Sequence, residues 1–332
     1  MKNLKHTFAI LVATIFVFTS CETTDDVDPP ISNPFNPPTA EAYSNLKDEA
    51  KALITEFKTF NAEDGLNFIS SNGVDITLPP NSLTLNGDVV SGEVELEYKE
   101  IFDRGTMLST NKTTMGRHPN GDKSLLISGG EFYINAIQNG EQLELNADIS
   151  LVIPSGLTGG GDQNMTLWDG EVDENDNLTW EEEEQDPAGR GGVFLEGDGA
   201  NGNYYAYFDS FGWTNVDRFY NDPRPKTMIL VDVPDGFDNT NSAVYLSYDG
   251  EGNNALANLD TYDPNTELFS EHYGQIPVGL EMHIIFATED DGQWRYAIKG
   301  VTVAENDVYS FTMSETTLGS LQQMTDAIND LP

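Results

Sequence analysis

The chain has 332 residues and a formal net charge of −40, with 16 basic and 56 acidic side chains. A surface this acidic repels the phosphate backbone of nucleic acids, so nucleic-acid binding is disfavoured. The single cysteine excludes an intramolecular disulfide, and the fold must therefore be stabilised by packing.

The first segment has the three parts of a secretory signal peptide. Lys2 and Lys5 form a basic start, residues 8–18 form an apolar run too short to span a bilayer, and small residues lead to Cys21. The order Phe18-Thr19-Ser20-Cys21 resembles the lipobox of bacterial lipoproteins. This resemblance implies that residues 1–20 are removed and that the Cys21 sulfur carries a lipid with palmitate-like acyl chains. An ordinary secretory signal followed by a free thiol is the alternative.

Residues 21–38 are predicted to be a disordered tether, because they combine acids with five prolines. The acids after Cys21 resemble the export signal of surface lipoproteins of the Bacteroidetes group, which implies an outer-membrane protein that faces the cell exterior. The lipid would then be its contact with the membrane, since each buried CH₂ of an acyl chain adds about 0.8 kcal/mol. An acidic tether with no role in export is the alternative.

A helix is predicted at the start of the folded part, over about residues 40–60 within a helical region of 39–64. Thr39 suits the N-cap position. Apolar residues then recur at three- and four-residue spacing, at Tyr43, Leu46, Ala50, Leu53, Ile54, Phe57 and Phe60. We expect this stripe to pack on the first β-sandwich, with partner binding as the alternative.

From residue 65 the apolar period changes to two, and turn signals recur at short intervals up to residue 220. This pattern predicts a first antiparallel β-sandwich over residues 65–220. Three motifs resemble the ZU-type sandwich of netrin receptors, ankyrins and tight-junction scaffolds: Ile76-x-Leu78-Pro79-x-x-Ser82-Leu83, Val90-x-Gly92-x-Val94-x-Leu96 and Ser128-Gly129-Gly130-x-Phe132. The resemblance implies an interaction or structural module, not a catalytic one.

A glycine- and acid-rich hairpin is predicted inside this region. Its turn contains Asp173, Asn175 and Asn177, which have the alternating spacing of oxygen ligands in a calcium loop. Leu178 stands where an EF-hand needs glycine, so an EF-hand is excluded and a looser calcium turn is the remaining metal hypothesis. A solvated turn is the alternative, because Asp and Asn also favour turns.

Aromatic residues are densest between residues 203 and 220, at Tyr204, Tyr205, Tyr207, Phe208, Phe211, Trp213, Phe219 and Tyr220. Tyr205, Trp213 and Asn215 are the candidate ligand-binding residues, because aromatic faces beside an amide can bind a sugar. The run from Phe211 to Phe219 also resembles a segment of uncharacterised surface lipoproteins, which implies no activity. We favour the other interpretation, a core cluster in which Asp217 and Arg218 pair locally.

The C-terminal part continues the β pattern. Residues 221–226 contain two prolines and are predicted to be a linker. A second antiparallel β-sandwich follows over residues 227–314. Residues 315–332 are predicted to be a helix with the stripe Leu318, Leu321, Met324, Ile328 and Leu331. The predicted fold is therefore mainly β, with two sandwiches and an amphipathic helix at each end.

No catalytic motif is found. His118, His272 and His283 lack zinc-site spacing, and the chain has no Gly-x-Ser-x-Gly elbow, phosphate loop or dinucleotide fingerprint. The sequence predicts a cell-surface lipoprotein that acts as a non-catalytic interaction or structural module, with proteins or glycans as partners and no cofactor besides the hypothetical calcium. Two alternatives are a glycan-binding accessory protein of an outer-membrane uptake system and a hydrolase with an unrecognised site, which a Ser–His contact would favour.

Overall fold

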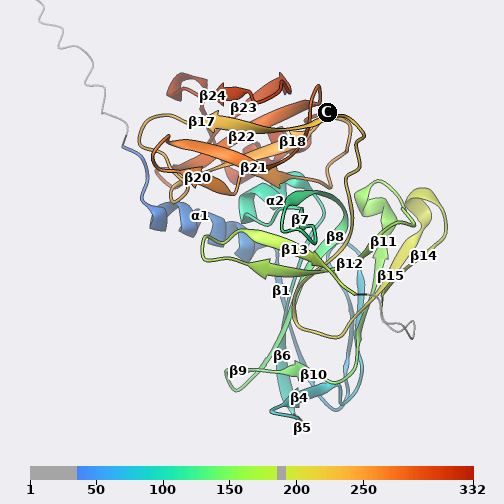
Figure 1. The fold of residues 1–332 in the computed structure, drawn as a ribbon. Helices are drawn as coiled ribbons and strands as arrows, with labels where there is room; N and C mark the ends of the chain where they lie inside the picture. The colour runs from blue at the N-terminus through green and yellow to red at the C-terminus, as the bar shows by residue number, and fades with distance from the viewer. Residues whose placement is uncertain (1–35, 185–191) are drawn as a thin grey trace, which may run out of the picture. The chain divides into compact units, whose positions relative to one another are not determined.

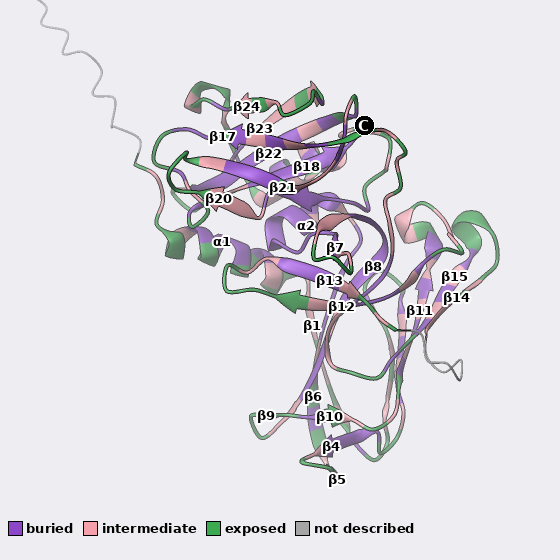
Figure 2. Cartoon of the chain, in the orientation of Figure 1, coloured by how far each residue is buried: buried purple, intermediate pink, exposed green. Residues whose placement is uncertain are grey.

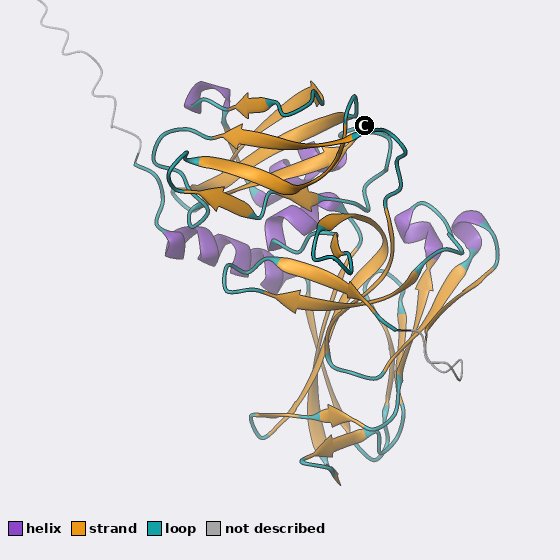
Figure 3. Cartoon of the chain, viewed as in Figure 1, coloured by secondary structure: helices purple, strands orange, loops and turns teal. Residues whose placement is uncertain are grey.

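The computed structural model describes residues 36–184 and 192–332, so Cys21 and the predicted signal peptide lie outside the described residues. Residues Pro37–Pro332 form one compact unit. Its described part is mainly β, as predicted, with three α-helices and five sheets (Figures 1 and 3). The division into two separate sandwiches stays a prediction. Among the described residues, no helix is both long enough and apolar enough to cross a membrane.

The largest sheet has eight strands in the order β1-β6-β8-β16-β12-β13-β7, with β9 beside β8. Their bounds are β1 (Thr55–Asn61), β6 (Glu93–Ile101), β7 (Met115–Arg117), β8 (Lys123–Gln138), β9 (Glu141–Gln142), β12 (Thr166–Val172), β13 (Leu178–Glu182) and β16 (Gly212–Phe219). Strand β7 pairs with both β13 and β8. Five of the strands therefore close on themselves, and they bury a cluster of Leu126, Trp168, Leu178 and Trp180.

A second, five-stranded sheet lies against this one, in the order β14-β15-β11-β3-β2. Its strands are β2 (Leu66–Ile69), β3 (Asp75–Leu78), β11 (Ile149–Pro154), β14 (Gly192–Glu196) and β15 (Asn203–Phe208). A three-stranded sheet contains β4 (Leu83–Leu85), β5 (Asp88–Val89) and β10 (Glu144–Leu145), and the 3₁₀ turns η1 (Ser155–Thr158) and η2 (Gly199–Asn201) connect strands. The Phe68 ring of β2 meets the Tyr98 ring of β6 edge-on at 5.5 Å, so side chains of the two sheets share a core.

The C-terminal part forms two further sheets. One has the order β20-β21-β17-β24 and the other β19-β18-β22-β23-β25. The bounds are β17 (Lys226–Asp232), β18 (Ser242–Tyr248), β19 (Ala257–Asn258), β20 (Thr261–Asp263), β21 (Leu268–Pro277), β22 (Glu281–Asp290), β23 (Gln293–Thr302), β24 (Val308–Ser310) and β25 (Thr317–Gly319), with η3 at Met313–Glu315. The Phe286 ring of β22 lies 5.1 Å from that of Phe237 and 6.1 Å from that of Phe311.

Three helices cover one face of the β18–β22–β23 sheet: α1 (Ala40–Leu53), α2 (Arg104–Thr110) and α3 (Leu321–Asn329). They share a buried core of Tyr43, Leu46, Met107, Leu108, Met324 and Ile328 with Tyr245, Ile285 and Trp294 of the sheet (Figure 2). The N-terminal helix was predicted to pack on the first sandwich. Its stripe meets Ile101 and α2 of that region, and it also meets the C-terminal sheet, where the Tyr43 and Trp294 rings lie 6.2 Å apart.

Helix α2 is held by α3. A Cβ at Gly105 would lie 2.8 Å from the Thr325 main-chain oxygen, so only glycine allows this close approach. Arg104 is fully buried. It donates hydrogen bonds to Ser247 Oγ and to the main-chain oxygens of Asn329, Leu331 and Pro332. The α2–α3 contact thus buries a cation among main-chain oxygens.

Both terminal helices are shorter than predicted. Helix α1 ends at Leu53, and Phe57 and Phe60 lie on β1, where Phe57 is 60% exposed. The segment from Ile54 is rich in β-branched residues and pairs with β6, which overrides the helical spacing. Helix α3 begins after Ser320, whose side chain forms a capping box with Gln323. Leu318 therefore lies on β25 and is 45% exposed.

Candidate functional site

A cleft of about 700 Å³ lies where β8, β16 and the end of β7 approach β17, β18 and β21. This volume is within the range of small-ligand sites. The lining residues come from segments on both sides of the predicted linker: His118, Ser124, Leu125, Asp162, Asn164, Arg218, Phe219, Tyr220, Asn221, Asp222, Lys226, Tyr248 and Gln275. Segments that are far apart in the sequence therefore come together to form this cleft, and no single local motif forms it.

Aromatic rings form part of the cleft wall. The His118 ring stacks on the Phe219 ring at 4.1 Å and 8°, and Phe219 meets the buried Trp168 ring edge-on at 5.0 Å. The Tyr220 ring meets the Tyr248 ring edge-on at 5.2 Å. Each cleft ring therefore rests on a second ring, which fixes the orientation of its face.

Charged side chains of the cleft are held by their neighbours. Arg218 Nε donates to Asp162 Oδ2 at 2.5 Å, and Arg218 Nη1 donates to the Phe219 main-chain oxygen at 3.2 Å. Asp222 accepts from the Tyr220 hydroxyl at 3.1 Å and from the Arg224 guanidinium. Hydrogen bonds from Arg224 hold the pKa of Asp222 well below its ordinary value. Desolvation and the nearby Asp222 raise the pKa of Tyr220 to about 12.

Lys226 differs from these paired groups. Its ammonium lies 6.0 Å from the centre of the Tyr220 ring. It makes no ion pair within the part of the chain that the structure describes. Partial burial lowers the pKa of Lys226. The cleft thus contains an ammonium group that makes no ion pair with a described residue, although the charge of Asp222 acts on it.

A Ser–His contact also lies in the cleft. Ser124 Oγ and His118 Nε2 are 2.8 Å apart, across the hairpin that joins β7 to β8. A serine triad also needs an acid on the second imidazole nitrogen. Among the described residues, none makes a hydrogen bond to His118 Nδ1. The described residues therefore provide a Ser124–His118 dyad but no acid that orients the His118 imidazole.

The three predicted ligand-binding residues are not brought together. Tyr205 is half-buried on β15, which pairs with β11 and β14, whereas Trp213 lies on β16, which pairs with β8 and β12. Trp213 is partly buried between two core clusters. Asn215 is fully buried and bonds to Ser128 and Asp217, at 3.0 and 2.7 Å. A single sugar platform of these three residues is thus excluded by their placement.

The predicted calcium turn is satisfied by its own hydrogen bonds. Asp173 Oδ1 accepts from the main-chain nitrogens of Asn175 and Asn177, both at 2.9 Å. The next acid, Asp176, lies near three ammonium groups, those of Lys47, Lys51 and Lys112 at 3.9, 3.2 and 2.6 Å. These three cations would repel calcium. Within residues 36–184 and 192–332, no group of three or more His, Cys, Asp or Glu side chains is arranged to hold a metal.

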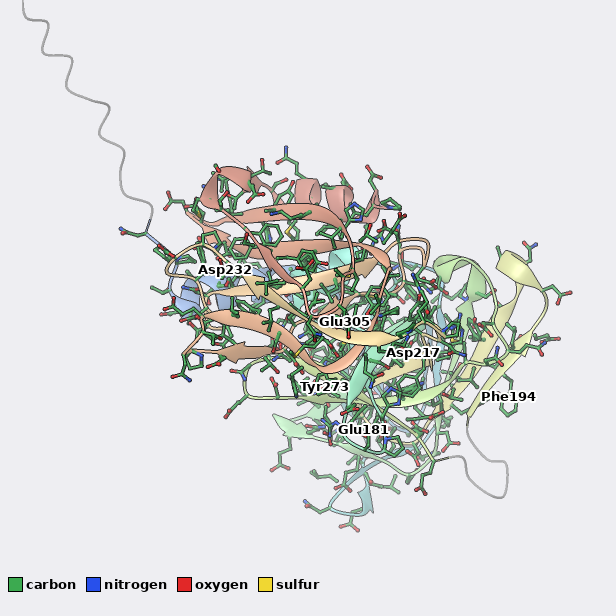
Figure 4. The ribbon with its side chains drawn as sticks, turned by 45° about the horizontal axis from the view of Figure 1, so that its top comes forward. Glu181, Phe194, Asp217, Asp232, Tyr273 and Glu305 are labelled. Carbon is green, nitrogen blue, oxygen red and sulfur yellow. The ribbon has the colours of Figure 1, made fainter. Side chains whose placement is uncertain are left out.

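A pair of buried acids was not predicted from the sequence. Glu131 of β8 and Asp217 of β16 are both fully buried, and no described residue makes a hydrogen bond to either Glu131 oxygen or to Asp217 Oδ1 (Figure 4 labels Asp217). Burial raises the pKa of both carboxyls well above the ordinary value. The predicted local pair of Asp217 with Arg218 is wrong, since Arg218 pairs with Asp162. Neighbouring residues on a strand point to opposite faces, which separates the two side chains.

Comparison with known proteins gives no family. No protein-family model matches the chain, and no curated protein matches it. Among solved structures, the chain is similar to the Gamma-CGTASE from Alkalophilic bacillus clarkii, with a TM-score of 0.18 and 10% sequence identity, over 76% of this chain and 41% of that chain. The chain thus spans less than half the length of that protein, and a TM-score this low carries no argument about fold or function.

Proposed function

We propose that the protein is a lipid-anchored cell-surface protein that binds a saccharide in the cleft without catalysing a reaction. The anchor is the lipid predicted on Cys21, and the protein faces the exterior of the outer membrane. This proposal joins the predicted interaction module to the glycan-binding alternative. It moves the binding site from Trp213 and Asn215 to the cleft at the other end of β16.

The observation that carries the proposal is the combination of aromatic faces and fixed polar groups in one cleft. Tyr220 and the stacked His118–Phe219 pair give the cleft aromatic surface on which the C–H side of a sugar ring can stack. Asn164 and Gln275 line the same cleft. Their side-chain nitrogens donate to Asp162 and Asp122, which leaves their side-chain oxygens to accept from sugar hydroxyl groups. A purely apolar ligand would leave these two oxygens unpaired, at about 1–3 kcal/mol for each oxygen that loses contact with water.

The proposal is tested with a glycan array and the purified full-length protein. The Tyr220→Ala variant removes one aromatic face, and we expect it to weaken glycan binding by about tenfold or more, since base and ring stacking contacts are worth about 1–3 kcal/mol. The matched control is Phe194→Ala, because Phe194 is 55% exposed on β14, outside the cleft. Loss of binding in Phe194→Ala with normal binding in Tyr220→Ala would place the site on the β14–β15 face.

A hydrolase is the second candidate function, because Ser124 Oγ lies 2.8 Å from His118 Nε2 in the same cleft. Its test is the hydrolysis of p-nitrophenyl acetate by the wild type and by Ser124→Ala. Under the binding proposal both proteins hydrolyse this ester equally slowly. A rate that depends on Ser124, together with labelling of Ser124 by a fluorophosphonate, would establish the hydrolase instead.

A further inference from the structure

We infer that the saccharide carries an anionic group, a carboxylate or a sulfate, and that Arg218 and Lys226 bind this group together. The inference rests on the proposed function and adds the class of the ligand. Both side chains line the cleft. Both also retain hydrogen-bond donors that no described residue uses.

The donors of Arg218 are partly occupied and oriented. Its Nε bonds to Asp162, and its Nη1 bonds to a main-chain oxygen, whereas its Nη2 has no partner among the described residues. Asp162 is itself fixed by the main-chain and side-chain nitrogens of Asn164, at 2.9 and 2.7 Å. These bonds and Arg218 lower the pKa of Asp162, which keeps it ionised at neutral pH. The guanidinium is therefore held in place before a ligand arrives, which reduces the entropy cost of binding.

The charge balance of the cleft also favours an anion. The whole chain has 56 acidic and 16 basic residues. The two acids that line the cleft each have a cation, since Asp162 pairs with Arg218 and Asp222 pairs with Arg224. Lys226 makes no ion pair with a described residue, although the charge of Asp222 also acts on it. On a strongly acidic protein, the cleft is a local region whose lining side chains carry no excess of negative charge.

The size of the ligand follows from the same balance. At physiological ionic strength, charges more than about 8 Å apart are largely screened. A single carboxylate or sulfate in the cleft therefore responds mainly to the charges of the cleft lining, which are the cations Arg218 and Lys226 and the acids Asp162 and Asp222. A long polyanion would also lie along the acidic surface, where it is repelled. The position of Lys226 beside the Tyr220 ring fits a sugar that stacks on the ring and carries its anionic group at the edge.

The experiment compares matched glycans on the full-length protein. A glycan array identifies which carboxylated, sulfated and neutral glycans are retained. Each retained acidic glycan is then compared by calorimetry with its uncharged form, the methyl ester of a uronate or the desulfated form of a sulfated sugar. We expect the charged form to bind about 10- to 100-fold more tightly, because a hydrogen bond to a charged group is worth about 1.5–3 kcal/mol.

Variants then assign the preference to the cleft. Lys226→Met is expected to remove most of the difference in affinity between the charged and uncharged glycans. Lys226 is exposed, so the variant is expected to fold. Lys58→Met is the matched control, because Lys58 lies on β1 and is absent from the cleft lining. The control should keep the full preference.

The outcomes separate the inference from the function on which it rests. Retention of neutral glycans with no preference for the charged form would overturn the inference and leave the saccharide function intact. An unchanged preference in Lys226→Met would also overturn it. No retained glycan of any class would overturn the proposed function itself. A preference confined to carboxylates or to sulfates supports the inference and identifies the group.

Discussion

The buried carboxyl of Glu131 gives a prediction about the pH dependence of stability. Burial raises the pKa of this group well above its ordinary value, and the nearby Asp217 raises it further. The folded state therefore keeps a proton that the unfolded state releases above about pH 4.3. Since the folded state binds more protons, its stability falls as pH rises from this value toward the raised pKa.

The size of the effect has an upper limit. One acid that stays protonated in the folded state costs about 1.4 kcal/mol per pH unit. Between pH 5 and pH 7, Glu131 alone would therefore cost up to about 3 kcal/mol. Glu131→Gln keeps the shape of the side chain and removes this titration. We expect the variant to gain up to about 3 kcal/mol of unfolding free energy at pH 7, and almost none at pH 4, where most unfolded chains also hold the proton.

The assay is urea unfolding followed by tryptophan fluorescence, repeated from pH 4 to pH 8. Trp168, Trp180 and Trp294 are nearly fully buried, so their emission reports the loss of the core. The control is Glu95→Gln, an exposed acid on β6, which should leave the pH profile unchanged. If Glu131→Gln had the wild-type slope of stability against pH, Glu131 would not be the proton-binding group.

Three further predictions concern the rest of the fold. Arg104→Met leaves the main-chain oxygens of Asn329 and Leu331 without their donor and should lower the unfolding free energy by about 3 kcal/mol in urea; a loss below about 1 kcal/mol would contradict this. Lys112→Met removes the 2.6 Å ion pair to Asp176 and should speed hydrogen exchange at the β12–β13 turn, whereas Lys58→Met should not. Millimolar calcium should leave the melting temperature unchanged, since calcium that bound only to the folded state would raise this temperature. A rise that Asp173→Asn abolishes would restore the calcium hypothesis.

The sequence predicted which residues form apolar faces better than it predicted which residues cover these faces. Tyr43, Leu46 and Ala50 are buried at the helical spacing that the sequence indicated. Their cover includes Trp294, which is about 250 positions away, and no local pattern specifies that partner. The pairing of β7 with both β8 and β13 was unpredictable for the same reason, because periodicity identifies a strand but not its neighbours.

The candidate site was predictable only in part. The aromatic stretch marked Phe219 and Tyr220, but three of the polar residues beside them, Ser124, Asp162 and Gln275, come from distant segments. The choice of Asn215 as a ligand-binding residue failed for a local reason. Its side chain points into the core of the large sheet, beside a register shift between Asn215 and Asp217 that the sequence does not reveal.

The bonds from Arg104 to α3 also constrain when the protein can finish folding. Arg104 and Asn329 are separated by 225 positions. The bonds to Asn329, Leu331 and Pro332 can therefore form only when the last residues of the chain are present. Until then, the apolar faces of α1 and α2 have no α3 to close over them. A chain that lost α3 would therefore expose an apolar surface to chaperones or proteases.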